Sequence, residues 1–367
     1  MRLFIAVIVV IILYSIQSLL YRRHWNLGLN IQLSFSKDIA NVGEQVILTE
    51  VIENKKALPL PILHVKFRTS RTFSFADTEN SQTTDHYYRN DVFSVLGKQK
   101  VTRTLPFVTT HRGYFTITEL HITSKDLFLT TTFADMLPNH AALYVFPSRL
   151  PLVRFAAIHE QMLGDFHTRR QSLNDPFAFY GIRPYQSYDS MRSINWKATA
   201  HTGALMVNQF EPATSNEVCI FLNLTPYMKA RAESLSEHAI NIANTIGTTF
   251  IEDKVDVSLC SNACDILTGK QAYLPAGHSQ DHKLSLSRTL SRIDLNQTCN
   301  DFMELLKSHI KEENHPVSYI LISTYRDDAL FSYFERHAED HSMYWIIPEF
   351  SHSDIHFQHA KIIKWEL

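Results

Sequence analysis

The sequence predicts a chain of mixed class, in which an apolar N-terminal helix precedes an all-β domain and an α/β domain. Three observations predict this. Residues 3–21 carry no charge, residues 31–146 alternate apolar and polar side chains at period two, and apolar runs alternate with helix-like segments after residue 217. A length of 367 residues allows two domains. We expect an anchor at 1–24, a β-sandwich at 25–150, a connector at 151–216 and a doubly wound α/β domain at 217–367.

The first segment has the length of a membrane-spanning helix. Its run LFIAVIVVIILYSIQSLL holds 18 residues, which form about 27 Å of helix against a bilayer hydrocarbon thickness of roughly 30 Å. A cleaved signal peptide is the alternative, but it would have a shorter apolar region and a small-residue cleavage site, whereas this run ends in SLLYRRHWN. Arg22 and Arg23 follow the run and only Arg2 precedes it, so we expect the soluble part to face the cytoplasm.

Charge and cysteine usage exclude several classes of function. A net charge of −2 gives no electrostatic basis for binding nucleic acid. The C-x-x-x-C spacing in the second half has no companion pair that would complete a zinc site. We therefore expect reduced thiols, in line with a cytoplasmic position. The four cysteines are Cys219, Cys260, Cys264 and Cys299.

The region after the anchor has the pattern of half-buried antiparallel strands. The runs IQLSFS, EQVILTEVIEN, LHVKFRTS, VTRTLPFV and LHITS alternate in polarity, and turn residues such as NVGEQ and HRGYF separate them. This pattern predicts a sandwich of roughly seven strands. No cluster of catalytic residue types occurs in it, so we expect a structural or interaction role.

The last 150 or so residues read as a mostly parallel sheet with helices between its strands. VCIFLNL, VDVSLCS, VSYILIS and MYWIIP are continuous apolar runs, as buried parallel strands are. Residues 232–254 place apolar side chains at helical spacing. No G-x-G-x-x-G follows the first strand, and neither a P-loop nor a G-x-S-x-G motif occurs. Dinucleotide, P-loop and α/β-hydrolase functions are thereby disfavoured.

The residues after the first of these strands resemble a degraded form of the von Willebrand factor A-type cation site. That family opens with hhhD-x-S-x-S, whereas this chain has Asn223, Thr225 and Tyr227 at the three positions. Thr298 matches the Thr of a later loop, and Thr324 stands after the fourth strand, where the expected Asp is missing. Because divalent cations need anionic oxygen ligands, we expect no cofactor and no Mg²⁺, and a sheet edge that docks a protein.

The connector carries a dense motif, GIRPYQSYDSMRSINWKATAHTGALMVNQFE. It resembles the signature of the bacterial family called domain of unknown function 58, which runs roughly F-x-G-x-R-x-Y-x-x-G-D-D-x-R-x-I-x-W-x-x-S-A-R-x-x-x-L-x-V-x-x-x-E. The chain departs at Gln186–Asp189, Thr199 and His201. The positions that fit are Phe179, Gly181, Arg183, Tyr185, Asp189, Arg192, Ile194, Trp196, Ala200, Leu205, Val207 and Glu211.

The residues of the motif also allow a local prediction. Asp189 suits the N-cap of a short helix whose apolar face is Met191, Ile194 and Ala198, with Gly203 after its end. Arginine pairs with carboxylates in a fork geometry, and a tryptophan offers a large face for packing. The motif is expected to lock the connector onto the α/β domain, or alternatively to dock a partner protein. Its candidate residues are Arg183, Tyr185, Asp189, Arg192, Trp196, Lys197 and Glu211, with Glu217 as a further acidic partner.

What the resemblance implies is a partner. Members of this family are commonly encoded beside a MoxR-type AAA+ ATPase and are associated with protein maturation or envelope stress. We therefore expect a non-enzymatic adaptor in a bacterial cytoplasmic membrane. Two alternatives remain open: a cation-dependent adhesion protein that faces outside the cell, and a thiol-dependent enzyme that uses one of the cysteines.

Overall fold

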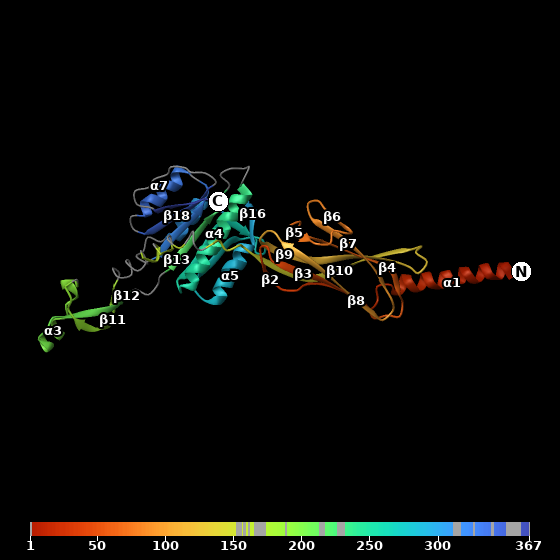
Figure 1. The fold of residues 1–367 in the computed structure, drawn as a ribbon, viewed down its shortest axis with the longest axis horizontal. Helices are drawn as coiled ribbons and strands as arrows, with labels where there is room; N and C mark the ends of the chain where they lie inside the picture. Colours follow the sequence, from red (N-terminus) through yellow and green to blue (C-terminus); the bar gives the residue numbers. More distant parts are fainter. Residues whose placement is uncertain are drawn as a thin grey trace. The chain divides into compact units, whose positions relative to one another are not determined.

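The computed structural model describes residues 2–151, 156, 159–160, 162–164, 174–187, 189–212, 217–225, 232–310, 317–325, 327–338, 341–349 and 361–366. Strands predominate in it, one apolar helix lies at the N-terminus, and helices and several sheets follow (Figure 1). The predicted mixed class is confirmed at this level. The chain divides into two compact units, 1–148 and 149–367.

The first unit consists of one helix and two sheets. The helix α1 (Arg2–His24) includes an 18-residue stretch, Val7–His24, that is apolar and long enough to cross a membrane. The sheets have the strand orders β1-β3-β8-β5 and β2-β10-β9-β4-β7-β6. Their strands are β1 (Leu29–Phe35), β2 (Ile39–Asn41), β3 (Gln45–Asn54), β4 (Leu60–Thr69), β5 (Phe73–Phe75), β6 (Ser81–Thr83), β7 (Tyr87–Val95), β8 (Gln99–Thr109), β9 (Gly113–Lys125) and β10 (Thr132–Phe146).

Both sheets turn their apolar faces toward one core. The burial pattern of β3 alternates along the strand, which places Val46, Leu48 and Ile52 inside, and β9 and β10 contribute from the other sheet. The expected number of strands, roughly seven, is too low, because ten are present between residues 29 and 146. β2, β5 and β6 have three residues each, which is too short for an alternating pattern to be recognised in the sequence.

The end of α1 packs into this core. The Tyr21 hydroxyl donates a hydrogen bond of 2.7 Å to the carbonyl oxygen of Pro59. The Trp25 ring stacks on that of Phe133 with 5.9 Å between centroids. Because both aromatic side chains are buried, the last turn of the helix is fixed to the sheets rather than being a free linker.

The second unit contains a hairpin and a larger sheet. The hairpin pairs β11 (Asn174–Pro184) with β12 (Met206–Pro212), and η1 (Met191–Ser193) and α3 (Trp196–Thr202) lie between these strands. The larger sheet has the order β15-β14-β13-β17-β18-β19, with β16 also paired to β14. Its strands are β13 (Glu217–Asn223), β14 (Asp256–Asp265), β15 (Gln271–Gly277), β16 (Ile293–Thr298), β17 (Val317–Ser323), β18 (Ser342–Glu349) and β19 (Lys361–Glu366).

Helices cover both faces of this sheet. α4 (Ala232–Glu252) and α5 (Gln280–Ser291) lie side by side on one face (Figure 1). On the other face, α6 (Phe302–His309) and α7 (Asp328–His337) share a core with the opposite side chains of the strands. Strand β13 shows why its sequence is apolar throughout: Val218 and Ile220 face the first core, while Cys219 and Phe221 face the second.

Candidate functional site

Three strands of the larger sheet end in polar side chains at the same edge. Asn223 is the last residue of β13, and Ser323, the last residue of β17, stands opposite it in the parallel ladder. Asn262 lies near the end of the neighbouring strand β14 and is buried. The carboxyl ends of parallel strands are where ligands bind in sheets covered on both faces. This edge is therefore the first place to look for chemistry.

The Asn262 side chain links the residues that the sequence placed in the degraded cation site. The backbone N–H of Leu224 donates to Asn262 Oδ1 at 2.9 Å. Because a backbone N–H only donates, this bond orients the amide so that Nδ2 points the other way. Asn262 Nδ2 donates to Asn223 Oδ1 at 3.1 Å and to Thr225 Oγ1 at 2.9 Å. The two oxygens that would face a cation thus face an N–H donor instead.

The other predicted members of this site are not joined to that network. Thr298 is exposed at the end of β16, opposite Ala263 of β14, and Thr324 is half-buried after β17. In the described ranges, no hydrogen bond connects either threonine to Asn223 or Thr225. Tyr227 falls outside the described residues. Asn262 was not predicted as a member of this site, because an Asn inside the run SLCSNAC, which already holds two serines, is a weak signal.

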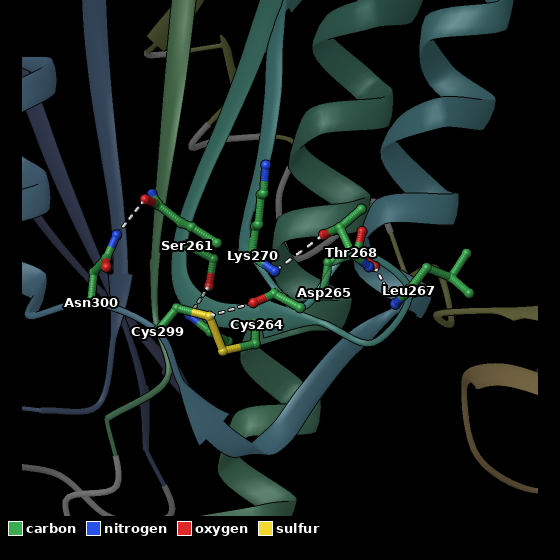
Figure 2. Close-up of a disulfide and its surroundings, with 11 residues drawn as sticks. Ser261, Cys264, Asp265, Leu267, Thr268, Lys270, Cys299 and Asn300 are labelled. Atoms are coloured by element: carbon green, nitrogen blue, oxygen red, sulfur yellow. Dashed lines mark hydrogen bonds between the residues drawn. A yellow bond between two sulfur atoms is a disulfide. The ribbon is translucent and has the colours of Figure 1, made fainter.

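Beside this edge, Cys264 and Cys299 form a disulfide (Figure 2). Their Cα atoms are 5.3 Å apart across 35 residues of sequence. The backbone N–H of Cys299 also donates to the Asn262 carbonyl oxygen at 2.8 Å, so the bridge adjoins the polar network. The expectation that all four cysteines are reduced is wrong for this pair, because β16 pairs with β14 and places the residue after it against β14.

The two remaining cysteines are buried in the core between β13, β14 and the helices α6 and α7. A hydrogen bond with Cys219, together with burial, raises the pKa of the Cys260 thiol far above its ordinary value. A nucleophilic cysteine needs an accessible thiol with a lowered pKa. Neither Cys219 nor Cys260 offers this environment.

In the connector, Arg183 and Asp189 form a closed pair. Arg183 Nη1 and Nη2 each donate to one carboxylate oxygen of Asp189 at 2.6 Å, and the Gln186 backbone N–H donates to Asp189 Oδ2 at 2.8 Å. These bonds, that of Arg183 first, hold the pKa of Asp189 below its usual value. The predicted N-cap role of Asp189 is wrong: its carboxylate is already occupied, and Ser190 Oγ accepts from the Arg192 backbone N–H instead.

The single short helix expected here is two separate pieces. Ile194 is extended and pairs with Val207 of β12, so η1 stops before it. Asn195 then caps α3 by accepting from the Ala198 backbone N–H at 2.9 Å. The expected apolar face of Met191, Ile194 and Ala198 is therefore wrong, because Ile194 is buried while Met191 is exposed. The predicted place of Gly203 is confirmed: it ends α3 in the left-handed region with φ of 71°.

The connector motif presents an apolar and cationic surface. The exposed fractions are 68% for Met191 and 65% for Trp196, and Arg192 and Lys197 between and beside them are also exposed. Across the described part of the chain, neither of these two basic residues forms an ion pair. Tyr185 is half-buried, and its backbone N–H bonds to the Leu205 carbonyl. We refer to Ile182, Met191, Arg192, Trp196, Lys197 and Leu205 as the hairpin surface.

Of the two acidic residues proposed as partners in this motif, only Glu217 has a described side chain. The Glu211 side chain falls outside the described residues, although its backbone belongs to β12. The carboxylate of Glu217 accepts a hydrogen bond from Ser258 Oγ at 3.0 Å, so it joins β13 to β14. The hairpin surface therefore keeps its positive charge without Glu217.

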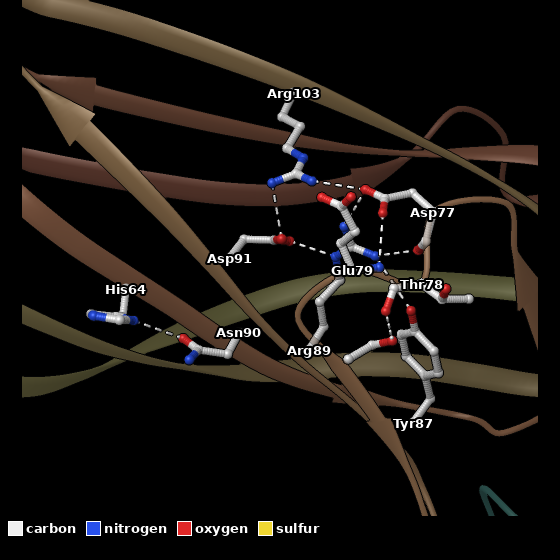
Figure 3. A network of polar contacts seen from close by, with 10 residues as sticks. His64, Asp77, Thr78, Glu79, Tyr87, Arg89, Asn90, Asp91 and Arg103 are labelled. Atoms are coloured by element: carbon white, nitrogen blue, oxygen red, sulfur yellow. Dashed lines mark hydrogen bonds and ion pairs between the residues drawn. The ribbon is translucent and has the colours of Figure 1, made fainter.

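The first unit holds an ionic network with a buried centre, which was not predicted from the sequence (Figure 3). Arg89 and Asp91 on β7 are both fully buried and pair at 2.6 Å, and Arg89 also pairs with Asp77 at 2.8 Å. From the other sheet, Arg103 of β8 reaches Asp91 at 2.9 Å and Asp77 at 2.8 Å. Two arginines and two aspartates thus balance one another and tie the two sheets together.

Glu50 is a third carboxyl group in this neutral cluster. It lies on β3 directly opposite Arg103 and is fully buried. Burial, and then the charge of Asp91, raise the pKa of Glu50 to about 8. The carboxyl group is therefore protonated in the folded protein at neutral pH.

Replacing Glu50 with glutamine should make the folded state less sensitive to pH. Between the ordinary pKa of 4.5 and the raised value of about 8, the folded wild type keeps a proton that the unfolded chain releases. Wild-type stability should therefore fall as the pH rises, by roughly 1 kcal/mol per pH unit, and the variant should lack this slope. Thermal unfolding of both proteins from pH 5 to pH 8 measures it, and parallel curves would contradict the protonated state.

A polar groove lies on the outer face of the second sheet of this unit. Its volume is about 780 Å³, and residues of β4, β6, β7 and β9 line it. Lys66, Arg68 and His121 stand on its walls together with Glu119. No group of three or more His, Cys, Asp or Glu side chains suited to a metal occurs among the residues that the structure describes.

Comparison with known proteins identifies the second unit. The model of the family described as "Protein of unknown function DUF58" matches residues 181–343, which include the connector motif and most of the larger sheet. This match supports the DUF58 family for the chain. This agrees with the resemblance carried by the connector motif.

Other comparisons add little to the DUF58 assignment. No curated protein matches the chain. Among solved structures, the CARDB domain of a Pyrococcus furiosus protein is similar at 11% identity over 31% of this chain and 90% of that one, with a TM-score of 0.20. A non-cellulosomal cohesin from Archaeoglobus fulgidus is 13% identical over 32% of this chain and 91% of that one, with a TM-score of 0.22. The sporulation control protein Spo0M from Bacillus subtilis is 10% identical over 43% of this chain and 58% of that one, with a TM-score of 0.19. Likenesses at these TM-scores support no functional argument.

Proposed function

We propose that this DUF58 protein is a non-enzymatic, membrane-anchored adaptor that works with a MoxR-type AAA+ ATPase in protein maturation or envelope stress. The observation that carries the proposal is the hairpin surface. Large apolar side chains with basic neighbours are exposed there, and exposed tryptophan, methionine and arginine are typical of protein interfaces. The identity of the partner comes from the family resemblance.

The larger sheet supports a von Willebrand factor A-like domain in this adaptor. If β16, which lies off the main path, is left out of the count, the strands follow the order 3-2-1-4-5-6, and the third strand, β15, is antiparallel to its neighbour β14. With helices on both faces, this is a doubly wound arrangement. The edge at which A-type domains hold a cation is occupied in this chain by the Asn262 amide.

We infer that this edge acts without a metal. A hard cation requires several oxygen ligands, of which carboxylates contribute most of the affinity. Asn223 and Thr225 supply neutral oxygens only, and both oxygens already accept hydrogen bonds from Asn262. Binding Mg²⁺ would require breaking these bonds, and neither Asn223 nor Thr225 offers a carboxylate in return, so the edge suits protein docking better than cation binding.

The anchor and its orientation complete the proposal. Val7–His24 supplies a helix that suits a single crossing of the bacterial cytoplasmic membrane. Arg22 and Arg23 follow its apolar part, which favours a cytoplasmic position for the soluble units. An ATPase partner requires this orientation, because it works where ATP is present.

Affinity purification of the full-length protein in detergent from its native host tests the adaptor function. We expect a MoxR-type ATPase to be recovered with the wild type and lost with Trp196→Ala combined with Arg192→Ala, because truncating central aromatic and arginine side chains commonly costs about 2 kcal/mol or more each. Both residues are exposed, so the variant should still fold.

The matched control removes apolar side chains from another exposed place in the same unit. Ile266→Ala combined with Leu267→Ala changes the turn after β14, where both side chains are about half exposed. This control should recover the ATPase as well as the wild type does. If the Trp196 and Arg192 variant recovers as much ATPase as the wild type does, the hairpin surface has no role in binding it. If neither the wild type nor any variant recovers an ATPase, the proposed partner is wrong.

A second function is favoured by one specific observation. The Cys264–Cys299 disulfide is typical of proteins that face an oxidising compartment, as an adhesion-type binding protein outside the cell would. This orientation is opposite to the one that Arg22 and Arg23 favour. A phosphatase reporter, active only outside the cytoplasm, fused after Leu367 separates the two: activity supports the outer position, and its absence supports the adaptor.

A further inference from the structure

We propose that the loop between β9 and β10, residues Asp126–Thr131, is a second membrane contact. It would insert Leu127, Phe128 and Leu129 into the leaflet at the soluble end of α1. The inference rests on the proposed membrane anchor, and it adds a lipid-binding site on the β-rich unit itself. The ligand of this site is the apolar part of a lipid bilayer.

The loop is held in one shape by the carboxylate of Asp126. Asp126 Oδ1 accepts from the backbone N–H groups of Thr130 at 2.6 Å and Thr131 at 3.0 Å, and Oδ2 accepts from Thr130 Oγ1 at 2.7 Å. The Leu129 backbone N–H donates to the Asp126 carbonyl at 3.0 Å. Leu129 itself has a φ of 60°, in the left-handed region that leucine rarely adopts. The turn is therefore built rather than loose.

This rigid turn presents three large apolar side chains to the outside. The exposed fractions are 52% for Leu127, 55% for Phe128 and 48% for Leu129. The polar groups of the turn, by contrast, are directed inward at Asp126, which is fully buried. Contiguous exposed apolar side chains on a satisfied turn are unfavourable in water and favourable against a membrane.

Contacts with α1 place the loop at the membrane. The rings of Tyr14 and Phe128 lie 6.2 Å apart, and the Tyr14 hydroxyl is 3.2 Å from Thr130 Oγ1. One turn nearer the end of the helix, Gln17 Nε2 donates to Asp126 Oδ2 at 3.2 Å. All these contacts lie within the first unit.

The position of Tyr14 along the helix sets the depth of the loop. Tyr14 precedes His24, the last residue of α1, by ten residues, which corresponds to about 15 Å of helix. A bilayer that surrounds α1 at the level of Tyr14 must therefore also reach Phe128. Tyr14 is exposed on this part of the helix, as aromatic side chains are at the boundary between lipid and water.

Fluorescent labelling in lipid nanodiscs tests the loop directly. Phe128→Cys in the full-length protein is labelled with an environment-sensitive dye under non-reducing conditions, where Cys219 and Cys260 are buried and Cys264 and Cys299 are paired. We expect the emission to shift to the blue and brominated acyl chains to quench it. Aqueous iodide should quench it less than it quenches a dye that is exposed to water.

Two matched labels keep the outcome interpretable. His111→Cys precedes the start of β9, whose 13 residues span about 40 Å, so its dye should be quenched by iodide and not by brominated lipid. Val10→Cys lies in α1 and reports the anchor, and its dye should be quenched by brominated lipid.

The results then separate the loop from the anchor. Lipid quenching at both 10 and 128 supports the proposal. Lipid quenching at 10 alone leaves the anchor in place and overturns the loop contact. The loop contact is also overturned if the dye at 128 is shielded from iodide but is not quenched by lipid, because that result would indicate that a second copy of this chain covers the loop. Absence of lipid quenching at 10 would overturn the anchor, and with it the inference.

Discussion

Replacing Arg89 with alanine should lower the free energy of unfolding of the N-terminal unit by about 3–5 kcal/mol, because it leaves a buried carboxylate without its partner. Arg89 has no exposed side-chain surface, and its guanidinium pairs with Asp91 and Asp77 and donates to the Asp77 carbonyl oxygen (Figure 3). Asp91 is equally buried. Without Arg89 it would keep the bond from Arg103, whose side chain is partly exposed.

The measurement is hydrogen exchange of β3, β7 and β8 in the detergent-solubilised full chain, which reports this unit separately from the second one. Arg103→Ala is the matched control. Arg103 contacts the same two aspartates, but 29% of its side chain is exposed, so water can replace part of what is lost. We expect a smaller loss of about 1–2 kcal/mol for it. Equal losses would contradict the dominant position of Arg89.

Removing both cysteines of the disulfide, by Cys264→Ser with Cys299→Ser, should destabilise the α/β domain by about 2–4 kcal/mol. Closing a loop across 35 residues restricts the unfolded chain and so favours the folded one. Thermal unfolding of the wild type and the variant measures the difference. Reductant should lower the wild-type transition to that of the variant and leave the variant itself unchanged.

The state of this disulfide in the cell also indicates on which side of the membrane the soluble units lie. In membranes isolated with thiol exchange blocked, the wild type should carry two reactive thiols after unfolding, those of Cys219 and Cys260. Four reactive thiols, together with a wild-type transition that ignores reductant, would mean that the pair is open in the cell. That result would remove the observation that favours an outer position and would support the cytoplasmic adaptor.

The buried strands and the long helices could be predicted because their signals are local. β13 and β17 are continuous apolar runs, since both faces of each strand are covered, and α4 repeats its apolar side chains at helical spacing. β15 and β16 could not be predicted in this way. β15 buries only two of its seven residues, and β16 mixes polar with apolar side chains, so neither contains a periodic pattern that exceeds that of a loop.

The sequence predicted some residues of the candidate site, but it did not predict the hydrogen bonds between them. Asn223 and Thr225 were selected because they follow a buried strand, and the structure joins them. Asn262, which determines the hydrogen bonding of both, is 39 residues away from Asn223, and only the pairing of β13 with β14 brings the two together. Asp189 was placed as an N-cap because caps depend on neighbouring residues, but the folded hairpin brings Arg183 to it first.

The sequence by itself determined the apolar N-terminal helix, the mixed class, the resemblance to DUF58 and the turn at Gly203, since each depends on residues that are close along the chain. Only the tertiary structure decided which cysteines pair, that Arg89 and Arg103 meet the same aspartates, and that the loop tip at Phe128 lies against Tyr14. The physical reason is the same in all three. Such contacts join residues far apart in sequence, and their geometry exists only after the strands have taken their register.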